Sequence, residues 1–164
     1  MRTRFCLQAA LSLAALAVFF ALPVSLFAQF QPPTSEELSM KEEPKAPGAA
    51  AIYLYREETV DDNLHYHSFF ARIKVLTEKG KELATVSVPY PKGKFSVTDV
   101  KARTIHADGT VIPLDVKPSD LVEQKGTGFQ INKMVFTLPS AEVGSILEYK
   151  WQLRYDDEVL SSPD

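Results

Sequence analysis

The stretch at residues 136–157, FTLPSAEVGSILEYKWQLRYDD, decides the fold class. In its second half, apolar side chains stand at every other position, with charged or polar residues between them. Successive side chains of a strand point to opposite faces, so this period of two predicts a β-strand with one face built for a core. The preceding run ends at Pro139, and residues 142–145 have the composition of a turn, which together predict a hairpin. The apolar set is Leu147, Tyr149, Trp151, Leu153 and Tyr155.

Strand-like runs fill the chain from residue 51 onward, and the turns between them carry Gly, Asn or Asp. Asp108 followed by Gly109 is the strongest hairpin signal, because glycine supplies the positive φ of a type I′ turn. Residues 115–128 form a less regular stretch, and no segment after residue 51 has a helical period. The sequence therefore predicts an all-β domain, an antiparallel β-sandwich with short loops. The runs cover residues 51–60, 64–77, 82–90, 95–107, 111–114 and 129–138.

The run at residues 64–77 does not keep a single alternation. Its apolar residues at positions 69, 71, 73 and 75 share one parity, whereas those at 64, 66 and 70 share the other. A β-bulge inserts one residue and so reverses the parity of a strand. We therefore expect a bulge at residues 68–70.

Residues 1–28 have the pattern of a secretory signal peptide. Arg2 and Arg4 precede an apolar run, Pro23 follows it, and Ala28 is the small residue at the expected cleavage position. The alternative is an uncleaved anchor, because the apolar region is long enough to cross a bilayer of about 30 Å.

Cleavage would also set the chemistry of the mature chain. Cys6 is the single cysteine, so its removal leaves no thiol for a disulfide, a zinc site or a nucleophile. Loss of Arg2 and Arg4 would change the formal net charge from −3 to −5. This balance argues against a binder of nucleic-acid backbones, which needs a basic face.

Residues 29–50 form a leader with four prolines and few large apolar residues, and it is expected to tie the signal to a domain at residues 51–164. Ser35 can cap a short helical turn in this leader, with Glu36 and Glu37 at the positive end of its dipole. A partner-binding amphipathic helix is the alternative, although so short a segment is marginal on its own.

The three histidines are the candidate metal ligands. His65 and His67 lie two apart on a predicted strand, so they would present two imidazoles on one face. His106 lies far away in the sequence next to Ala107 and Asp108, and the sequence offers no recognisable third or fourth ligand. We interpret the histidines as packing or surface residues and expect neither a metal nor a cofactor.

Acidic pairs and aromatic side chains are the other candidates for chemistry. Adjacent strand residues point to opposite faces, so each acidic pair is interpreted as a solvated turn or edge and not as a catalytic dyad. Strand aromatics at a period of two favour core or cross-strand packing over stacking on a sugar or peptide. The sequence contains no nucleophile elbow, P-loop or dinucleotide glycine pattern, so no catalytic or binding residue is assigned. The acidic pairs are Glu57 with Glu58, Asp61 with Asp62 and Asp156 with Asp157, and the aromatic candidates are Tyr53, Tyr55, Tyr66, Tyr149, Trp151 and Tyr155.

Two blocks carry a resemblance to a bacterial exported family. The hairpin ARTIHADGTVIPL at residues 102–114 and the block LPSAEVGSILEY at residues 138–149 are similar to that family's turn and strand signatures. The resemblance extends over residues 33–157 and concerns the domain of unknown function commonly found N-terminal to a transglutaminase-like domain. It implies a β-sandwich whose second half follows the last strand, and a downstream module with a Cys, His and Asp constellation.

The resemblance implies no catalytic residue in this chain, because no cysteine outside the signal segment matches the downstream nucleophile. We expect an incomplete sandwich and a non-catalytic exported module, periplasmic or extracellular, that positions a transglutaminase-like domain of the same polypeptide. One alternative is a stand-alone module that binds an envelope glycan or a peptide, and another is a small hydrolase that uses carboxylates. No nucleic-acid partner is expected, and membrane contact is expected only through an uncleaved signal segment.

Overall fold

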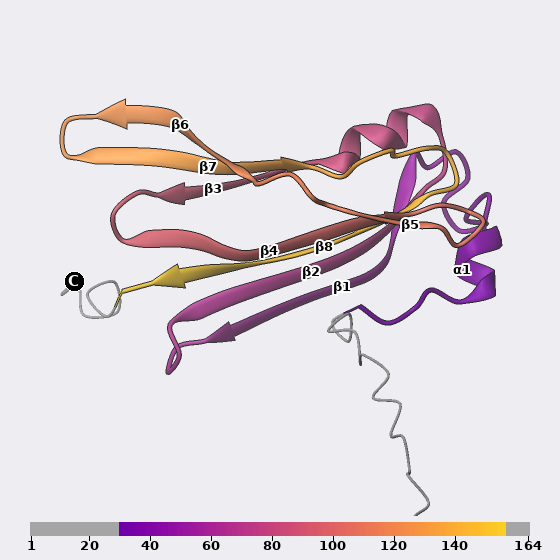
Figure 1. Cartoon of the computed structure of the whole chain (residues 1–164), viewed down its shortest axis with the longest axis horizontal. Coiled ribbons are helices and arrows are strands. Elements are labelled where there is room, and N and C mark those ends of the chain that lie inside the picture. Colours follow the sequence, from indigo (N-terminus) through magenta and orange to yellow (C-terminus); the bar gives the residue numbers. More distant parts are fainter. Residues whose placement is uncertain (1–29, 157–164) are drawn as a thin grey trace, which may run out of the picture. The chain divides into compact units, whose positions relative to one another are not determined.

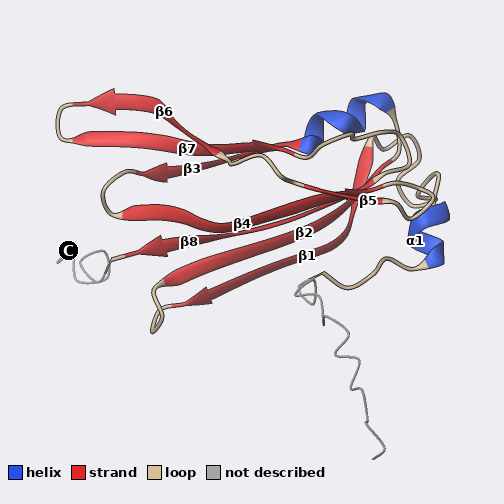
Figure 2. Ribbon diagram, in the orientation of Figure 1, coloured by secondary structure: helices blue, strands red, loops and turns tan. Residues whose placement is uncertain are grey.

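The computed structural model describes residues 30–156, and its strands form two β-sheets (Figures 1 and 2). The described residues from Pro32 onward belong to one compact unit. Every pair of neighbouring strands is antiparallel, which confirms the predicted all-β fold class. The elements are α1 (Ser35–Ser39), β1 (Ala51–Asp61), β2 (Tyr66–Val75), the 3-10 helix η1 (Glu78–Ala84), β3 (Thr85–Pro91), β4 (Phe95–Ile105), β5 (Val111–Pro113), β6 (Ser119–Gly126), β7 (Phe129–Thr137) and β8 (Ile146–Tyr155).

The five-stranded sheet has the order β1-β2-β8-β4-β5, and the three-stranded sheet has the order β3-β7-β6. Strand β8 is the strand predicted from the alternating stretch, and it pairs with β2 on one side and β4 on the other. Figure 1 shows it between these two strands. Its alternation therefore reflects a central strand with one face on the core.

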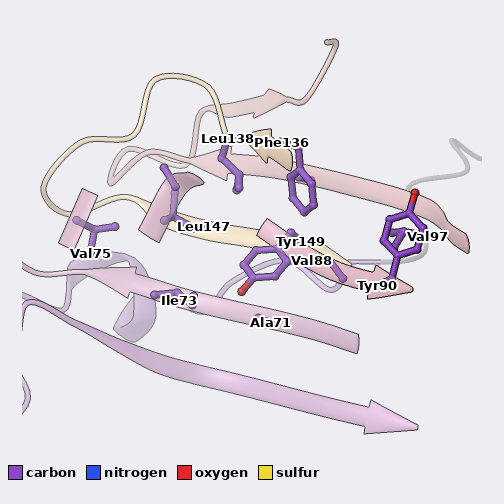
Figure 3. Packing of buried hydrophobic residues seen from close by; sticks show 12 residues of the cluster. Ala71, Ile73, Val75, Val88, Tyr90, Val97, Phe136, Leu138, Leu147 and Tyr149 are labelled. Carbon is purple, nitrogen blue, oxygen red and sulfur yellow. The ribbon is translucent and has the colours of Figure 1, made fainter. Parts of the chain in front are cut away.

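The hydrophobic core lies between the two sheets. We call the face of the five-stranded sheet that contacts this core the inner face, and the opposite face the outer face. Across the two sheets, the Phe136 ring of β7 meets the Tyr149 ring of β8 edge to face with centroids 5.9 Å apart (Figure 3). The buried members are Ala71, Ile73, Val75, Ala84, Val88, Tyr90, Val97, Ala102, Phe136, Leu138, Leu147 and Tyr149.

Burial falls off along the inner strands, so the core is closed at one end and half open at the other. In β2, residues 71–75 are buried and residues 66–70 are only partly buried. In β8, residues 146–149 are buried and residues 150–155 are partly buried or exposed. The partly buried members packed against the core at this second end include Phe69, Trp151 and Leu153.

The predicted bulge at residues 68–70 is wrong. Strand β2 pairs with β8 without interruption from Tyr66 to Lys74, and the register shift lies in β1, between Tyr53 and Tyr55. The second parity of β2 is accommodated on the outer face, where the Phe70 ring packs against Tyr55 of β1 with centroids 5.6 Å apart. Further along the same face, Arg72 and Lys74 are both buried, and Lys74 is as fully buried as its inner-face neighbours.

The helical segments differ in detail from the sequence predictions. The short helix in the leader is confirmed as α1, but its N-cap is Thr34 and not Ser35. The Thr34 hydroxyl accepts from the Glu37 N–H, and the Glu37 carboxylate accepts from the Thr34 N–H, which forms a capping box. The expected turn after β2 is η1, where a Cβ on Gly80 would lie 2.2 Å from the Ala50 carbonyl oxygen.

The less regular stretch at residues 115–128 contains strand β6, all of whose residues are exposed. Because no side of β6 is buried, its sequence carries no alternation of apolar and polar residues. The predicted signal peptide at residues 1–28 lies outside the described residues. Within residues 30–156, no helix is long and apolar enough to cross a membrane.

Candidate functional site

A row of ring side chains runs along the inner face from the closed end to the half-open end. The Phe69 ring stacks on Tyr149 with centroids 5.8 Å apart, and on Trp151 at 5.3 Å with an angle of 11° between the planes. His67 meets Trp151 edge to face, with centroids 5.5 Å apart. We call these four residues, His67, Phe69, Tyr149 and Trp151, the aromatic stripe. The stripe exists because the register of β2 and β8 places Phe69 directly opposite Trp151.

Strand β1 gives the aromatic stripe a charged rim. Arg56 lies over the Phe69 ring at 5.4 Å from its centroid and forms an exposed ion pair with Glu58. This cation–π contact is possible because Arg56 and Glu58 pair in register with Ala71 and Phe69, on the same face as the stripe. The hydrogen bond from Arg56 lowers the pKa of the Glu58 carboxyl. The rim therefore carries both signs of charge.

His67 combines a ring contact with an unsatisfied nitrogen. Its Nε2 is buried and has no hydrogen-bond partner, and the carboxylate oxygen Glu58 Oε2 lies 4.0 Å away. His65 does not belong to β2, because it precedes the strand in a turn with a φ of 51°. The expectation that both histidines lie on one strand is therefore wrong.

The described residues contain no group of three His, Cys, Asp or Glu side chains that could hold a metal ion. The His65 ring packs against Tyr155 with centroids 5.8 Å apart. The His106 ring nitrogen Nε2 lies 3.0 Å from the Ser140 carbonyl oxygen. These contacts place the histidines in separate packing environments.

The acidic residues of the first two pairs have local partners. Glu57 accepts a hydrogen bond from the Tyr55 hydroxyl, while Glu58 pairs with Arg56 on the opposite face of β1. Asp61 accepts from two backbone N–H groups of the following turn, both at 3.0 Å. Asp62 accepts from the Tyr155 hydroxyl at 2.8 Å, and Asp157 lies outside the described residues. Glu57, Glu58 and Asp61 thus lie on the edge strand β1, and Asp62 lies in the turn after it.

The aromatic candidates divide between the two faces of the five-stranded sheet. Tyr149 and Trp151 belong to the inner face, and burial raises the pKa of the Tyr149 hydroxyl far above its usual value, with a smaller contribution from nearby Tyr53. Tyr155 also lies on the inner side, where its ring packs against Phe95 with centroids 6.0 Å apart. Tyr55 and Tyr66 have the opposite parity and lie on the outer face. The predicted packing role therefore fits Tyr149 and Trp151 best.

A buried ion network lies on the outer face, where the sequence pattern predicts only charges that point away from the core. Arg72 and Arg103 each donate through Nε to one oxygen of Glu148, whose side chain is fully buried. Arg72 also donates through Nη1 to Glu37 of α1 at 3.1 and 3.2 Å. The three charges on the sheet meet because Arg72 and Arg103 both pair in register with Glu148.

Lys74 lies beside this network and is fully buried. Its ammonium donates to the Leu38 carbonyl at 2.8 Å and to the Gly144 carbonyl at 2.6 Å. Burial lowers the pKa of Lys74, because desolvation disfavours its charged form. The outer face of β2 thus binds the leader through two cationic side chains.

A second polar cluster, which the sequence pattern does not predict either, lies in the three-stranded sheet. The Asp120 carboxylate accepts from the Tyr90 hydroxyl and the Asn132 amide at 2.7 Å each, and from the Lys92 ammonium at 3.0 Å. These bonds lower the pKa of Asp120, with the Tyr90 hydroxyl making the largest contribution. Tyr90, Asp120 and Asn132 belong to β3, β6 and β7, so the hydrogen bonds of this carboxylate join the three strands of the sheet.

A shallow pocket lies beside β7 and carries no acid–base pair. It is lined by Leu114, Val116, Lys117, Ser119, Val135, Phe136 and Thr137. Lys117 is the single charged member of this lining. The aromatic stripe at the half-open end is therefore the stronger candidate site, and its chemistry suits binding.

Comparison with known proteins gives a family and a fold. A family model described as a domain of unknown function with a solved structure, DUF3857, matches residues 62–162. The search of curated proteins found no match. A crystal structure of a candidate protease from Parabacteroides distasonis ATCC 8503 matches with a TM-score of 0.50 and 12% identity. The match covers 56% of this chain and 19% of that one, so the chain spans about a fifth of that protein, and the likeness concerns the fold alone.

Proposed function

The chain belongs to the DUF3857 family, and from this premise we propose that it is a non-catalytic β module that packs against and positions a transglutaminase-like domain of the same polypeptide. The module is exported, periplasmic or extracellular, and it uses neither a metal nor a cofactor. Its role is structural: it presents a rigid sheet face to the neighbouring domain.

The half-open end of the core is the observation that carries this proposal. Phe69 and Trp151 stack on each other and pack on the buried cluster, yet both remain partly exposed. Fully burying a large apolar side chain contributes about 1.5–3 kcal/mol, so covering the exposed part of two rings would contribute roughly 2 kcal/mol to a domain contact. A cluster of partly exposed rings with a charged rim is typical of a protein interface.

The fold match supports a module within a longer protein. The Parabacteroides distasonis chain is about five times longer than the part that this fold matches. In that protein the matched fold is one part of a larger chain. We extend this arrangement to the present protein as part of the proposal.

The stripe suits a protein partner better than a glycan. A sugar ring stacks on the open face of an aromatic side chain, but Trp151 already has Phe69 stacked with it and His67 in an edge-to-face contact. The Phe69 ring likewise stacks with Trp151 and Tyr149, and Arg56 lies over it. These neighbours leave less ring surface for a sugar, whereas partly exposed rings still pack well against apolar protein side chains.

The first experiment is the intact mass of the native protein, captured from cells with an antibody against residues 51–156. We expect a mass well above that of residues 29–164, with a transglutaminase-like sequence in the additional part. A mass equal to residues 29–164 would contradict positioning in cis and would favour a stand-alone peptide-binding module.

The second experiment tests the surface in that native protein. Trp151→Ala is expected to increase proteolytic cleavage between the module and the neighbouring domain, because the variant removes the largest ring of the contact. Tyr55→Ala is the matched control, since Tyr55 is an exposed aromatic on the outer face of the same sheet. Equal cleavage of the two variants would contradict the proposed interface.

A further inference from the structure

Helix α1 is attached to the outer face through hydrogen bonds and ion pairs, without a fully buried side chain of its own. The five residues of α1 include no buried residue. Polar contacts join the helix to the sheet: the Glu37 carboxylate accepts from Arg72, and the Leu38 carbonyl accepts from Lys74. Arg72 and Lys74 stand two apart on β2, so their side chains point to the same side of the sheet. The spacing of the two cations therefore matches a carboxylate and the next carbonyl of one helical turn.

We propose that Arg72 and Lys74 form a docking site for a short acidic helix, and that α1 occupies this site as a releasable segment. The ligand is a capped helical turn with glutamate at its third position. The Glu37 carboxylate both binds the sheet and caps the helix, because it accepts from Arg72 and also from the Thr34 N–H in the capping box. Loss of docking and loss of the cap are thus coupled.

Release of α1 is energetically accessible because none of its residues is fully buried, and Leu38 is its one partly buried apolar residue. A helix of five residues is marginal in isolation, so α1 depends on its contacts with the sheet. Buried charges lose hydration, and their pairing offsets that cost only partly. On release, Lys74 regains water, and Arg72 keeps Glu148 as its partner. The docked and released states are therefore closer in free energy than an apolar contact would make them.

The chain between α1 and β1 permits this movement. Most of residues 40–50 are exposed, and two of them are the prolines Pro44 and Pro47. The hydrogen bonds between main-chain groups in residues 43–49 are local, from Ala46 to Glu43 and from Ala49 to Ala46. This segment can act as a hinge without breaking a strand. The inference concerns the outer face and stands apart from the proposed role of the aromatic stripe.

Hydrogen exchange of the full chain tests whether α1 is released. We expect the Glu37 and Leu38 amides to exchange at least tenfold faster than the amides of residues 71–75, with little dependence on denaturant. These two amides are hydrogen-bonded to Thr34, so their protection reports the docked turn. Exchange of these amides only through global unfolding would overturn the proposal.

A peptide competition tests the chemistry of the site. A fluorescent peptide of residues 32–40 is titrated into the full chain carrying Glu37→Gln, and we expect at least tenfold tighter binding than to the unaltered chain. Glu36→Gln in the chain is the matched control, because Glu36 is exposed in the same turn. The same peptide with Glu37→Gln is expected not to bind. A folded Glu37→Gln chain that does not bind the unaltered peptide would overturn the inference.

Discussion

Arg72 and Glu148 lie opposite each other on neighbouring strands, with the Arg72 Nε 2.5 Å from Glu148 Oε1 and the Glu148 side chain fully buried. They are separated by 76 positions in the sequence. The pair joins the first half of the chain to its last described strand. The same glutamate also receives Arg103, so three strands of the sheet meet at one carboxylate.

Glu148→Gln is expected to lower the free energy of unfolding by about 3 kcal/mol, because removal of one partner from a buried ion network leaves the other charges uncompensated. Urea denaturation measures this change. Glu123→Gln is the control, since the Glu123 pair with Lys133 is longer, 3.6 Å, and exposed, and such a pair contributes under about 1 kcal/mol. Equal losses for the two variants would contradict a structural role for the network.

Lys74 should give stability a dependence on alkaline pH. Its pKa in the folded state is lowered by burial, so the unfolded chain binds more protons at pH values between the folded pKa and the usual value of about 10.4. Stability of the unaltered chain should therefore rise with pH across that window relative to Lys74→Met. The difference between the two unfolding curves, measured from pH 7 to 10, cancels the titration of the tyrosines. A constant difference would show that Lys74 is not desolvated.

Asp120 should also make stability rise with pH, but in the acidic range. Its folded pKa is lowered by hydrogen bonds from Tyr90, Asn132 and Lys92, so its contribution is present above the unfolded pKa of about 3.9 and is lost as pH falls through the folded value. Asp120→Asn should therefore be less stable than the unaltered chain at pH 7, and this gap should shrink at pH 3. Chemical denaturation at both pH values checks this, and a gap of the same size at both would contradict it.

Replacing a large side chain by alanine should lower the free energy of unfolding more at the closed end of the core than at the half-open end. Leu147→Ala at the closed end is expected to cost about 2–5 kcal/mol, the usual range for a fully buried leucine. Trp151→Ala at the half-open end should cost less than the 3–5 kcal/mol usual for a buried tryptophan, because its ring is only partly buried. Thermal and urea denaturation of the same protein give both values. A loss at Trp151 of 4 kcal/mol or more would show that this end is closed.

Local patterns in the sequence predicted the strands, but they did not predict which charged side chains are buried. The alternation at residues 146–155 predicted a strand with Tyr149 and Trp151 on the core face, and the structure places both there. The same alternation placed Glu148 on the other face, without a sign that this face is also buried. Its burial depends on Arg72, Arg103 and the leader, which only the fold brings together.

The candidate site was predictable only in part. Trp151 and Tyr149 were named as candidates for packing, but Phe69, Arg56 and their alignment with the stripe follow from strand register. Register depends on pairing between distant segments, and a shift by one residue reverses every side chain. The error at residues 68–70 has the same origin, since a change of parity can mean a bulge or two buried faces.

The sequence by itself determined the all-β class, the position of most strands and the short capped helix, because alternation and capping are properties of neighbouring residues along one backbone. Tertiary structure alone decided that Lys74 and Glu148 are buried, that His67 lies against Trp151, and that the inner face is half open. These features arise from contacts across the sheets. The free energy of such contacts depends on which distant residues the fold brings within a few ångströms, and no local pattern encodes that choice.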